Sequence, residues 1–85
     1  MTRYEKCITK EQSRGARAML GLSRDDLARL SKVGVATLAD FEAGKRTPYD
    51  RTLADIRAAL EAAGIEFIAE NGGGPGVRLR KNAEV

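Results

Sequence analysis

Apolar residues recur every three or four positions through most of the chain, which is the spacing of amphipathic helices. This pattern predicts four helices, over residues 9–20, 23–31, 35–43 and 51–63. Thr9 and Ser23 each begin a capping box, with Gln12 and Asp26 three residues further on. Glycine at positions 21, 44 and 64 is expected to end three of these helices, since glycine readily adopts the left-handed conformation. Asp50 or Thr52 is expected to cap the fourth helix.

The apolar positions of the helices also predict the core. Ala16, Met19 and Leu20 share one face of the first helix. From the other three helices we expect seven core residues, namely Leu27, Leu30, Leu38, Phe41, Leu53, Ile56 and Leu60. Val33 would fill the corner between the second and third helices, where the small side chain of Ala28 lets them approach.

After Gly64 the pattern changes to alternation, which is typical of β-strands. Residues 65–70 and 77–80 are predicted to form a β-hairpin around the glycine-rich turn 71–76. Its apolar face comprises Ile65, Phe67, Val77 and Leu79, with Ile68 on the opposite face. The charged residues of that opposite face are expected to form cross-strand ion pairs, between Arg78 and Arg80 on one strand and Glu66 and Glu70 on the other.

An isolated two-stranded hairpin is marginally stable in water, so this one requires a partner surface. A second copy of the chain could cover its edge or its apolar face, with a dimer interface at Ile65, Phe67, Ile68, Val77 and Leu79. Alternatively, the hairpin folds back over its own helices. We favour the dimer.

The length of 85 residues fits one small domain. We divide it into a flexible N-terminus (1–8), a helical domain (9–63), the hairpin (65–80) and a tail (81–85). A single cysteine, Cys7, excludes an intrachain disulfide, and the lack of histidine removes the usual zinc ligand sets. We therefore expect no metal, no cofactor and no enzymatic activity. With no membrane-length apolar run and no signal-peptide pattern at the start, we expect a cytoplasmic protein.

The formal net charge is +3, and the whole excess lies in the first half of the chain. Residues 1–50 carry ten Lys and Arg against seven Asp and Glu, whereas residues 51–85 carry five of each. This asymmetry suits a surface that binds a polyanion.

Two short helices joined by the connection 32–34 have the plan of a helix-turn-helix. The residues at and around them resemble the Cro/cI-type (XRE) helix-turn-helix family, through Leu20-Gly21-Leu22-Ser23, Leu27-Ala28, Val33, Leu38, Phe41-Glu42-Ala43-Gly44-Lys45-Arg46 and Pro48. The resemblance implies a mainly α fold, a lambda-repressor-like bundle of four or five helices, here followed by a C-terminal β-hairpin. Lys32 departs from the family, which often has glycine at this position.

The resemblance also implies roles for individual residues. The third helix would be the recognition helix and would contact bases through Val35, Ala36, Ala39 and Asp40. The DNA backbone would be contacted by Arg24, Gly34, Thr37, Lys45 and Arg46. Arg17 and Glu42 match a pair that forms a buried salt bridge in the family. For Tyr49, a hydrogen bond to phosphate and simple packing remain alternatives.

Together these features predict a bacterial or phage transcriptional regulator that binds double-stranded DNA. We expect a homodimer on an inverted-repeat operator, acting as a repressor that includes its own promoter among its targets. The alternative function is an antitoxin or anti-activator, whose main partner is another protein. An acidic contact with RNA polymerase at Asp25 and Asp26 is a further alternative, although helix capping explains these residues more simply.

Overall fold

Side-chain caps define where the first two helices begin. The computed structural model describes residues 8–81, and its first helix is α2 (Lys10–Leu20), followed by α3 (Arg24–Ser31). Both predicted capping boxes are present. The backbone N–H of Gln12 donates to Thr9 Oγ1 at 3.0 Å, and the Thr9 N–H donates to Gln12 Oε1 at 2.9 Å. Ser23 and Asp26 exchange the same two bonds at the start of α3.

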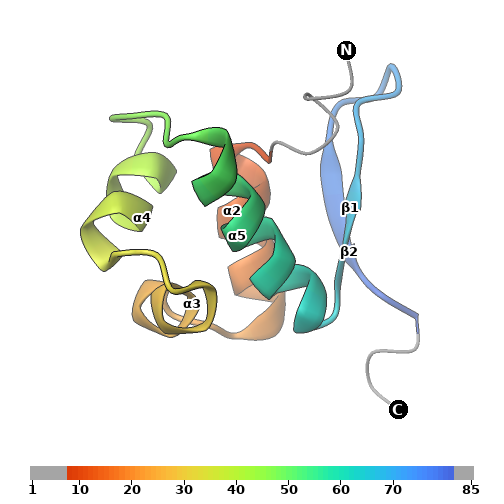
Figure 1. The fold of residues 1–85 in the computed structure, drawn as a ribbon. Coiled ribbons are helices and arrows are strands. Elements are labelled where there is room, and N and C mark those ends of the chain that lie inside the picture. The colour runs from red at the N-terminus through yellow and green to blue at the C-terminus, as the bar shows by residue number, and fades with distance from the viewer. Residues whose placement is uncertain (1–7, 82–85) are drawn as a thin grey trace.

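The remaining described elements are α4 (Val35–Glu42), α5 (Asp50–Ala62), β1 (Ile65–Ile68) and β2 (Gly76–Leu79) (Figure 1). They confirm the predicted mainly helical fold with a C-terminal hairpin. The N-terminus, Cys7 and the tail of the predicted organisation lie outside the described residues, except for Ile8 and Lys81. Ile8 is only 5% exposed and belongs to the core, so packing begins one residue before the first predicted cap.

The predicted cap of the fourth helix is wrong. Tyr49 is the N-cap of α5, and its side chain makes no capping hydrogen bond. Asp50 lies within the first turn instead, and Thr52 follows it inside the helix. A carboxylate at Asp50 still favours the positive end of the helix dipole, which explains why an acidic residue suits this position without capping it.

The predicted glycines follow three of the helices with positive φ, namely Gly21 at the C-cap of α2, and Gly44 and Gly64 directly after the C-caps of α4 and α5. Gly21 ends α2 with φ 71°, as predicted. α3 differs. Lys32 ends α3 with φ 60°, and it is the only non-glycine residue with positive φ among residues 8–81. This turn thus has the left-handed geometry that favours glycine, and a lysine adopts it here at some cost.

The core lies where the four helices and β1 meet. Its largest fully buried apolar side chains are Leu27, Leu38, Ile56, Leu60 and Ile65. The prediction that Leu30 belongs to the core is wrong, because this residue is 53% exposed. The buried face of α3 is formed by Leu27, Ala28 and Ser31, which places Leu30 on the flank of the helix. The Ser31 hydroxyl donates to the Leu27 carbonyl at 2.7 Å, so this buried polar group is satisfied within the helix.

The hairpin packs on its own helices. β1 and β2 pair antiparallel, with Ile65 opposite Leu79 and Phe67 opposite Val77. Ile65 is completely buried, and Phe67 and Val77 pack partly buried against the core. The Gln12 amide donates to the carbonyl of Gly76 at 2.9 Å and joins the N-terminal part of α2 to β2. For the inner face of the hairpin, the structure thus favours the fold-back alternative.

The outer face of the hairpin is charged. Arg78 and Glu66 form the predicted cross-strand ion pair, with a shortest contact of 3.0 Å. The second predicted pair is wrong, because Arg80 donates to the Glu61 carbonyl. Glu70 instead accepts hydrogen bonds from the backbone of Gly72 and Gly74 and closes the turn. Register explains the difference, since Glu70 lies beyond the last paired residue of β1.

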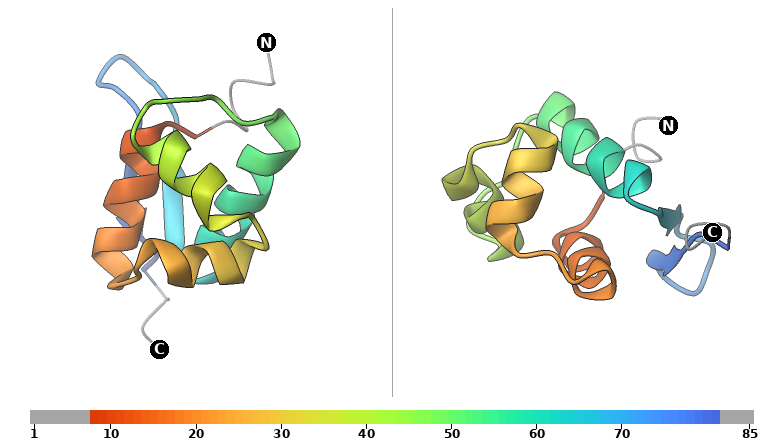
Figure 2. Two further views of the ribbon diagram at one scale, coloured as in Figure 1. Left: turned by 90° about the vertical axis from the view of Figure 1, so that its left-hand side faces the viewer. Right: turned by 90° about the horizontal axis from the view of Figure 1, so that it is seen from below.

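The hairpin and α4 lie on opposite sides of the molecule. In Figure 1, α2 and α5 stand between α4 on the left and the hairpin on the right. The left view of Figure 2 faces α4, and the hairpin lies behind the helices. Within residues 8–81, no helix is long and apolar enough to cross a membrane.

Candidate nucleic-acid interface

The outward surface of α4 carries the residues predicted to contact bases. Leu38 and Phe41 face the core, and this orients the other side of the helix toward solvent (Figure 2). Val35 is 47% exposed, and the other three residues of this set are exposed or half-buried, namely Ala36, Ala39 and Asp40. α4 therefore presents a small, mostly apolar surface with one carboxylate.

The end of α4 is fixed to α2 through Glu42. The predicted pair is present: Arg17 Nη2 lies 2.7 Å from Glu42 Oε1, and Arg17 Nε contacts both carboxylate oxygens. Ser13 Oγ also donates to Glu42 Oε2, at 2.5 Å. Glu42 is 2% exposed and Ser13 is completely buried. A buried carboxylate bonded by this many donors holds α4 in one orientation relative to α2.

Sequence reasoning missed two members of this group, Ser13 and Arg14. Arg14 donates to the backbone carbonyl of Glu42, at the C-terminal end of α4. Ser13 precedes Arg17 by one helical turn, so both side chains face the same neighbour. This spacing was the available signal, although the sequence pattern alone assigned Ser13 no role.

Beside α4, several polar side chains surround a hollow of about 370 Å³. Its lining brings together three of the predicted backbone-contacting residues, Thr37, Arg46 and Tyr49, and adds Thr47, Pro48 and Thr52. The Tyr49 side chain is 86% exposed, which argues against the packing alternative for this residue. Four hydroxyl groups and a guanidinium form a surface suited to an anion such as phosphate.

Arg46 also approaches α4. Its Nη1 lies 4.0 Å from Asp40 Oδ2, and both side chains are largely accessible to solvent. Lys45 is exposed, and its backbone N–H donates to the Asp40 carbonyl at 2.8 Å. Lys45 and Arg46, in the loop after α4, thus both contact Asp40, which is a predicted base contact.

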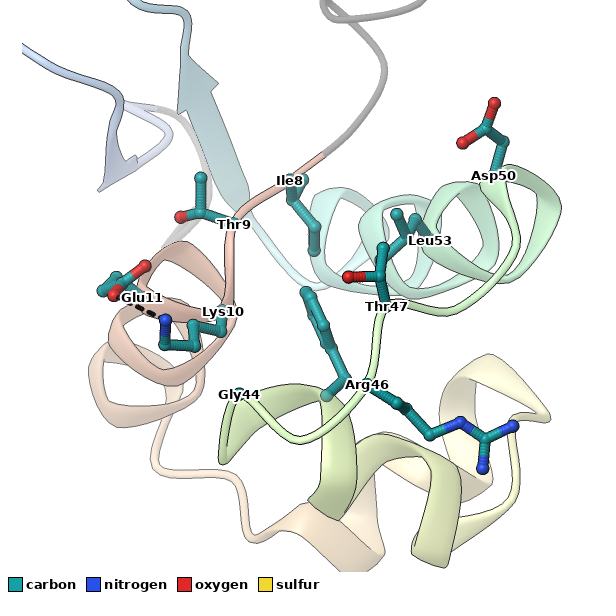
Figure 3. Close-up of a pocket in the computed structure, with 10 residues that line it drawn as sticks. Ile8, Thr9, Lys10, Glu11, Gly44, Arg46, Thr47, Asp50 and Leu53 are labelled. Carbon is teal, nitrogen blue, oxygen red and sulfur yellow. Dashed lines mark ion pairs between the residues drawn. The ribbon is translucent and has the colours of Figure 1, made fainter.

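A second hollow, of about 660 Å³, lies between the start of α2 and the loop that leads to α5 (Figure 3). Its lining combines apolar side chains, such as Phe41 and Leu53, with charges of both signs. Lys10 and Glu11 lie on its rim, where Lys10 Nζ is 3.4 Å from Glu11 Oε2. Arg46 borders this hollow too, but in Figure 3 its guanidinium points away from the middle of the hollow.

The other two predicted backbone contacts lie at helix starts. Arg24 is exposed in the first turn of α3, and Gly34 is the exposed N-cap of α4. Backbone N–H groups at helix N-termini favour anions, so both positions suit phosphate. Among residues 8–81, no group of His, Cys, Asp and Glu side chains could hold a metal ion.

Comparison with known proteins assigns the family. A helix-turn-helix family model of the XRE type matches residues 14–65, which is more than half of the chain. A comparison with curated proteins gives no match. The family match supports a DNA-binding regulator, in agreement with the exposed face of α4 and the polar hollow beside it. The chain belongs to the XRE-type helix-turn-helix family.

Proposed function

We propose that this protein is a transcriptional regulator that binds an inverted-repeat operator as a homodimer, with α4 as its recognition helix. The observation that carries the proposal is the outward face of α4, which is exposed while the end of the helix is held by the buried Glu42 group. A rigidly held helix with a free face can enter the major groove in one orientation. Because its target is DNA, we propose the cytoplasm as its compartment, and repression of promoters, its own included, as the outcome of binding.

The base contacts in this proposal are few. Val35, Ala36 and Ala39 offer methyl groups, which suit the thymine methyl group, and Asp40 offers an acceptor for the cytosine amine. Such a surface can form few hydrogen bonds with the edges of the bases. Sequence-dependent DNA shape would therefore contribute to the specificity of this regulator.

Backbone contacts would hold this helix in register. The hydroxyl-rich hollow beside α4 would accept a phosphate through Thr37, Arg46 and Tyr49. Arg24, Gly34 and Lys45 would add contacts around it. Each neutralised phosphate releases counterions, so the affinity of this protein for DNA should fall steeply as salt rises.

Dimerisation is proposed through the edge of the hairpin. Both recognition helices of a dimer must face the same DNA, and the hairpin lies on the side away from α4 (Figure 1). Stacking two outer hairpin faces would point the two α4 helices in opposite directions. Edge-to-edge pairing keeps them on one side. The sheet has two strands, so each strand has an outer edge, and Leu79 is 51% exposed beside one of them.

The direct test is selection of binding sites from random DNA, followed by affinity measurements across a range of salt concentrations. We expect an inverted repeat whose half-site centres lie about one helical turn apart, near 34–36 Å, or a multiple of this. Lys45→Ala should weaken binding to every sequence. Failure to enrich any sequence would contradict a sequence-specific regulator and would favour the antitoxin or anti-activator alternative.

The proposed dimer has its own test, by sedimentation of two matched leucine variants. Leu79→Glu places a charge beside the strand edge and should shift the protein toward monomer. Leu30→Glu changes a leucine that is equally exposed, at 53%, but lies on α3, and it should leave the oligomeric state unchanged. If both variants sediment with the same oligomeric state, the hairpin edge is not the dimer contact.

A further inference from the structure

The recognition helix carries no positive charge of its own. Its sequence, Val35–Glu42, contains two charged residues, and both are acidic. Glu42 is buried and neutralised by Arg17, so Asp40 is the only charged side chain that α4 offers to a ligand. DNA carries about one negative charge per 1.7 Å of helix axis, so an uncompensated carboxylate at this surface would be repelled.

Arg46 is placed to compensate this carboxylate. Its Nη1 lies 4.0 Å from Asp40 Oδ2, with side chains 57% and 40% exposed, respectively. The loop that carries Arg46 is tied to α4 by the hydrogen bond from the Lys45 N–H to the Asp40 carbonyl. An exposed pair of this kind contributes little to stability, so both side chains remain available to a ligand.

Arg46 also borders the hydroxyl-rich hollow beside α4. None of the six described residues that line this hollow carries a carboxylate, so Arg46 is its only charged group. A guanidinium has five N–H donors in a planar fork, which allows one edge to serve a phosphate and the other a carboxylate. The ammonium of a lysine lacks this two-sided geometry.

From this arrangement we infer that Arg46 is a positioning residue that sets the base preference of the protein through Asp40. The inference rests on the proposed DNA-binding function. One edge of the guanidinium binds a DNA phosphate at the hollow, and the other holds Oδ2 of Asp40. The second carboxylate oxygen, Oδ1, then accepts a hydrogen bond from a base amine, for which cytosine N4 is the expected donor. Arg46 thus links backbone contact to base recognition.

The experiment compares the affinity for the selected operator with the affinity for operators changed at one base pair. Discrimination is the ratio of the affinity for the selected operator to the affinity for the changed operator. Asp40→Ala should reduce this ratio about tenfold at one base-pair position, the usual scale of one good base contact. Arg46→Ala should reduce discrimination at that same position and also lower the affinity for all sites. In the double variant, the discrimination should equal that of Asp40→Ala alone, because Arg46 acts on it only through Asp40.

Arg46→Lys separates charge from geometry. It should keep most of the affinity, because the positive charge near phosphate remains, and it should lose the discrimination, because the fork is gone. Lys45→Ala is the matched control, a neighbouring exposed cation whose removal should weaken all sites and leave discrimination intact.

The inference is overturned if Arg46→Ala weakens binding to all sites equally, or if Arg46→Lys keeps the discrimination between base pairs. It is also overturned if Asp40→Ala leaves the discrimination unchanged at every position. In each of these cases the proposed DNA-binding function would stand, because the unaltered protein would still select an operator. Failure of the unaltered protein to select any sequence would overturn both proposals.

Discussion

The Ser13 hydroxyl donates a hydrogen bond of 2.5 Å to Oε2 of Glu42, and both side chains are buried. With the Arg17 guanidinium on the same carboxylate, α2 holds the end of α4 by two side chains one turn apart. The group combines stability with orientation, since any loss of a donor leaves a buried negative charge less compensated.

We therefore predict that Arg17→Met lowers the free energy of unfolding by roughly 3–5 kcal/mol, because Glu42 remains buried without its counterion. Ser13→Ala should cost less, about 1.5–3 kcal/mol, the range for a hydrogen bond to a charged group. Urea unfolding measures both. The double variant Arg17→Met, Glu42→Leu should recover part of the loss. A change below 1 kcal/mol for Arg17→Met, taken as roughly the size of a surface pair, would show that the charge is not effectively buried.

Lys32→Gly should stabilise the protein. At φ 60°, Lys32 adopts a conformation that costs an L-residue about 1 kcal/mol relative to glycine. The midpoint of urea unfolding should rise accordingly. Lys32→Ala provides the control for loss of the charge, since alanine bears the same strain and should leave the midpoint nearly unchanged. A lower midpoint for the glycine variant would contradict this explanation.

Gln12 has two separable roles, which Gln12→Glu distinguishes. A glutamate at this position keeps an acceptor for the Thr9 N–H but replaces the amide donor that bonds the Gly76 carbonyl. We expect α2 to form normally while the hairpin becomes more mobile, at a cost of about 1–3 kcal/mol. Hydrogen exchange should show faster exchange of amides in β1 and β2 than in α2. Gln12→Ala, which removes both hydrogen bonds, should also speed amide exchange at the start of α2.

Acid should weaken the start of α3. The Ser23 N–H, followed by the Arg29 side chain, holds the pKa of the Asp26 carboxyl below its ordinary value of 3.8. A lowered pKa contributes stability that is present above the ordinary value and is lost as pH falls through the folded-state value. The stability difference between the unaltered protein and Asp26→Asn should therefore be constant near neutral pH. It should close below about pH 4, in urea unfolding measured at several pH values. A difference that is constant down to pH 2 would contradict this.

Local chemistry made part of the fold predictable. Capping boxes at Thr9 and Ser23 and the glycine at position 21 depend only on residues within one turn, and all three formed. Leu30 was misplaced because apolar character alone does not say which flank of a short helix meets a neighbour. The Arg80 pairing failed for a similar reason, since it required a register that only the folded hairpin defines.

The position of helix α4 and the Arg17–Glu42 pair were predictable, because the family pattern fixes where they fall along the chain. Contacts between distant segments were not. The hydrogen bond from Gln12 to Gly76 joins residues 64 positions apart, and nothing in the local sequence of either residue indicates it. The approach of Arg46 to Asp40 depends on how the loop after α4 turns back, which its composition does not specify.

The position of the hairpin behind α2 and α5 has a practical consequence for handling this protein. β2 ends at Leu79, on the side of the molecule away from α4 (Figure 1). A small tag or tether attached at Lys81 would leave the exposed face of α4 unobstructed, whereas a bulky fusion there would crowd the hairpin edge that we propose as the dimer contact. This side of the molecule thus suits a short tether for immobilising the protein on a chip with α4 facing the solution.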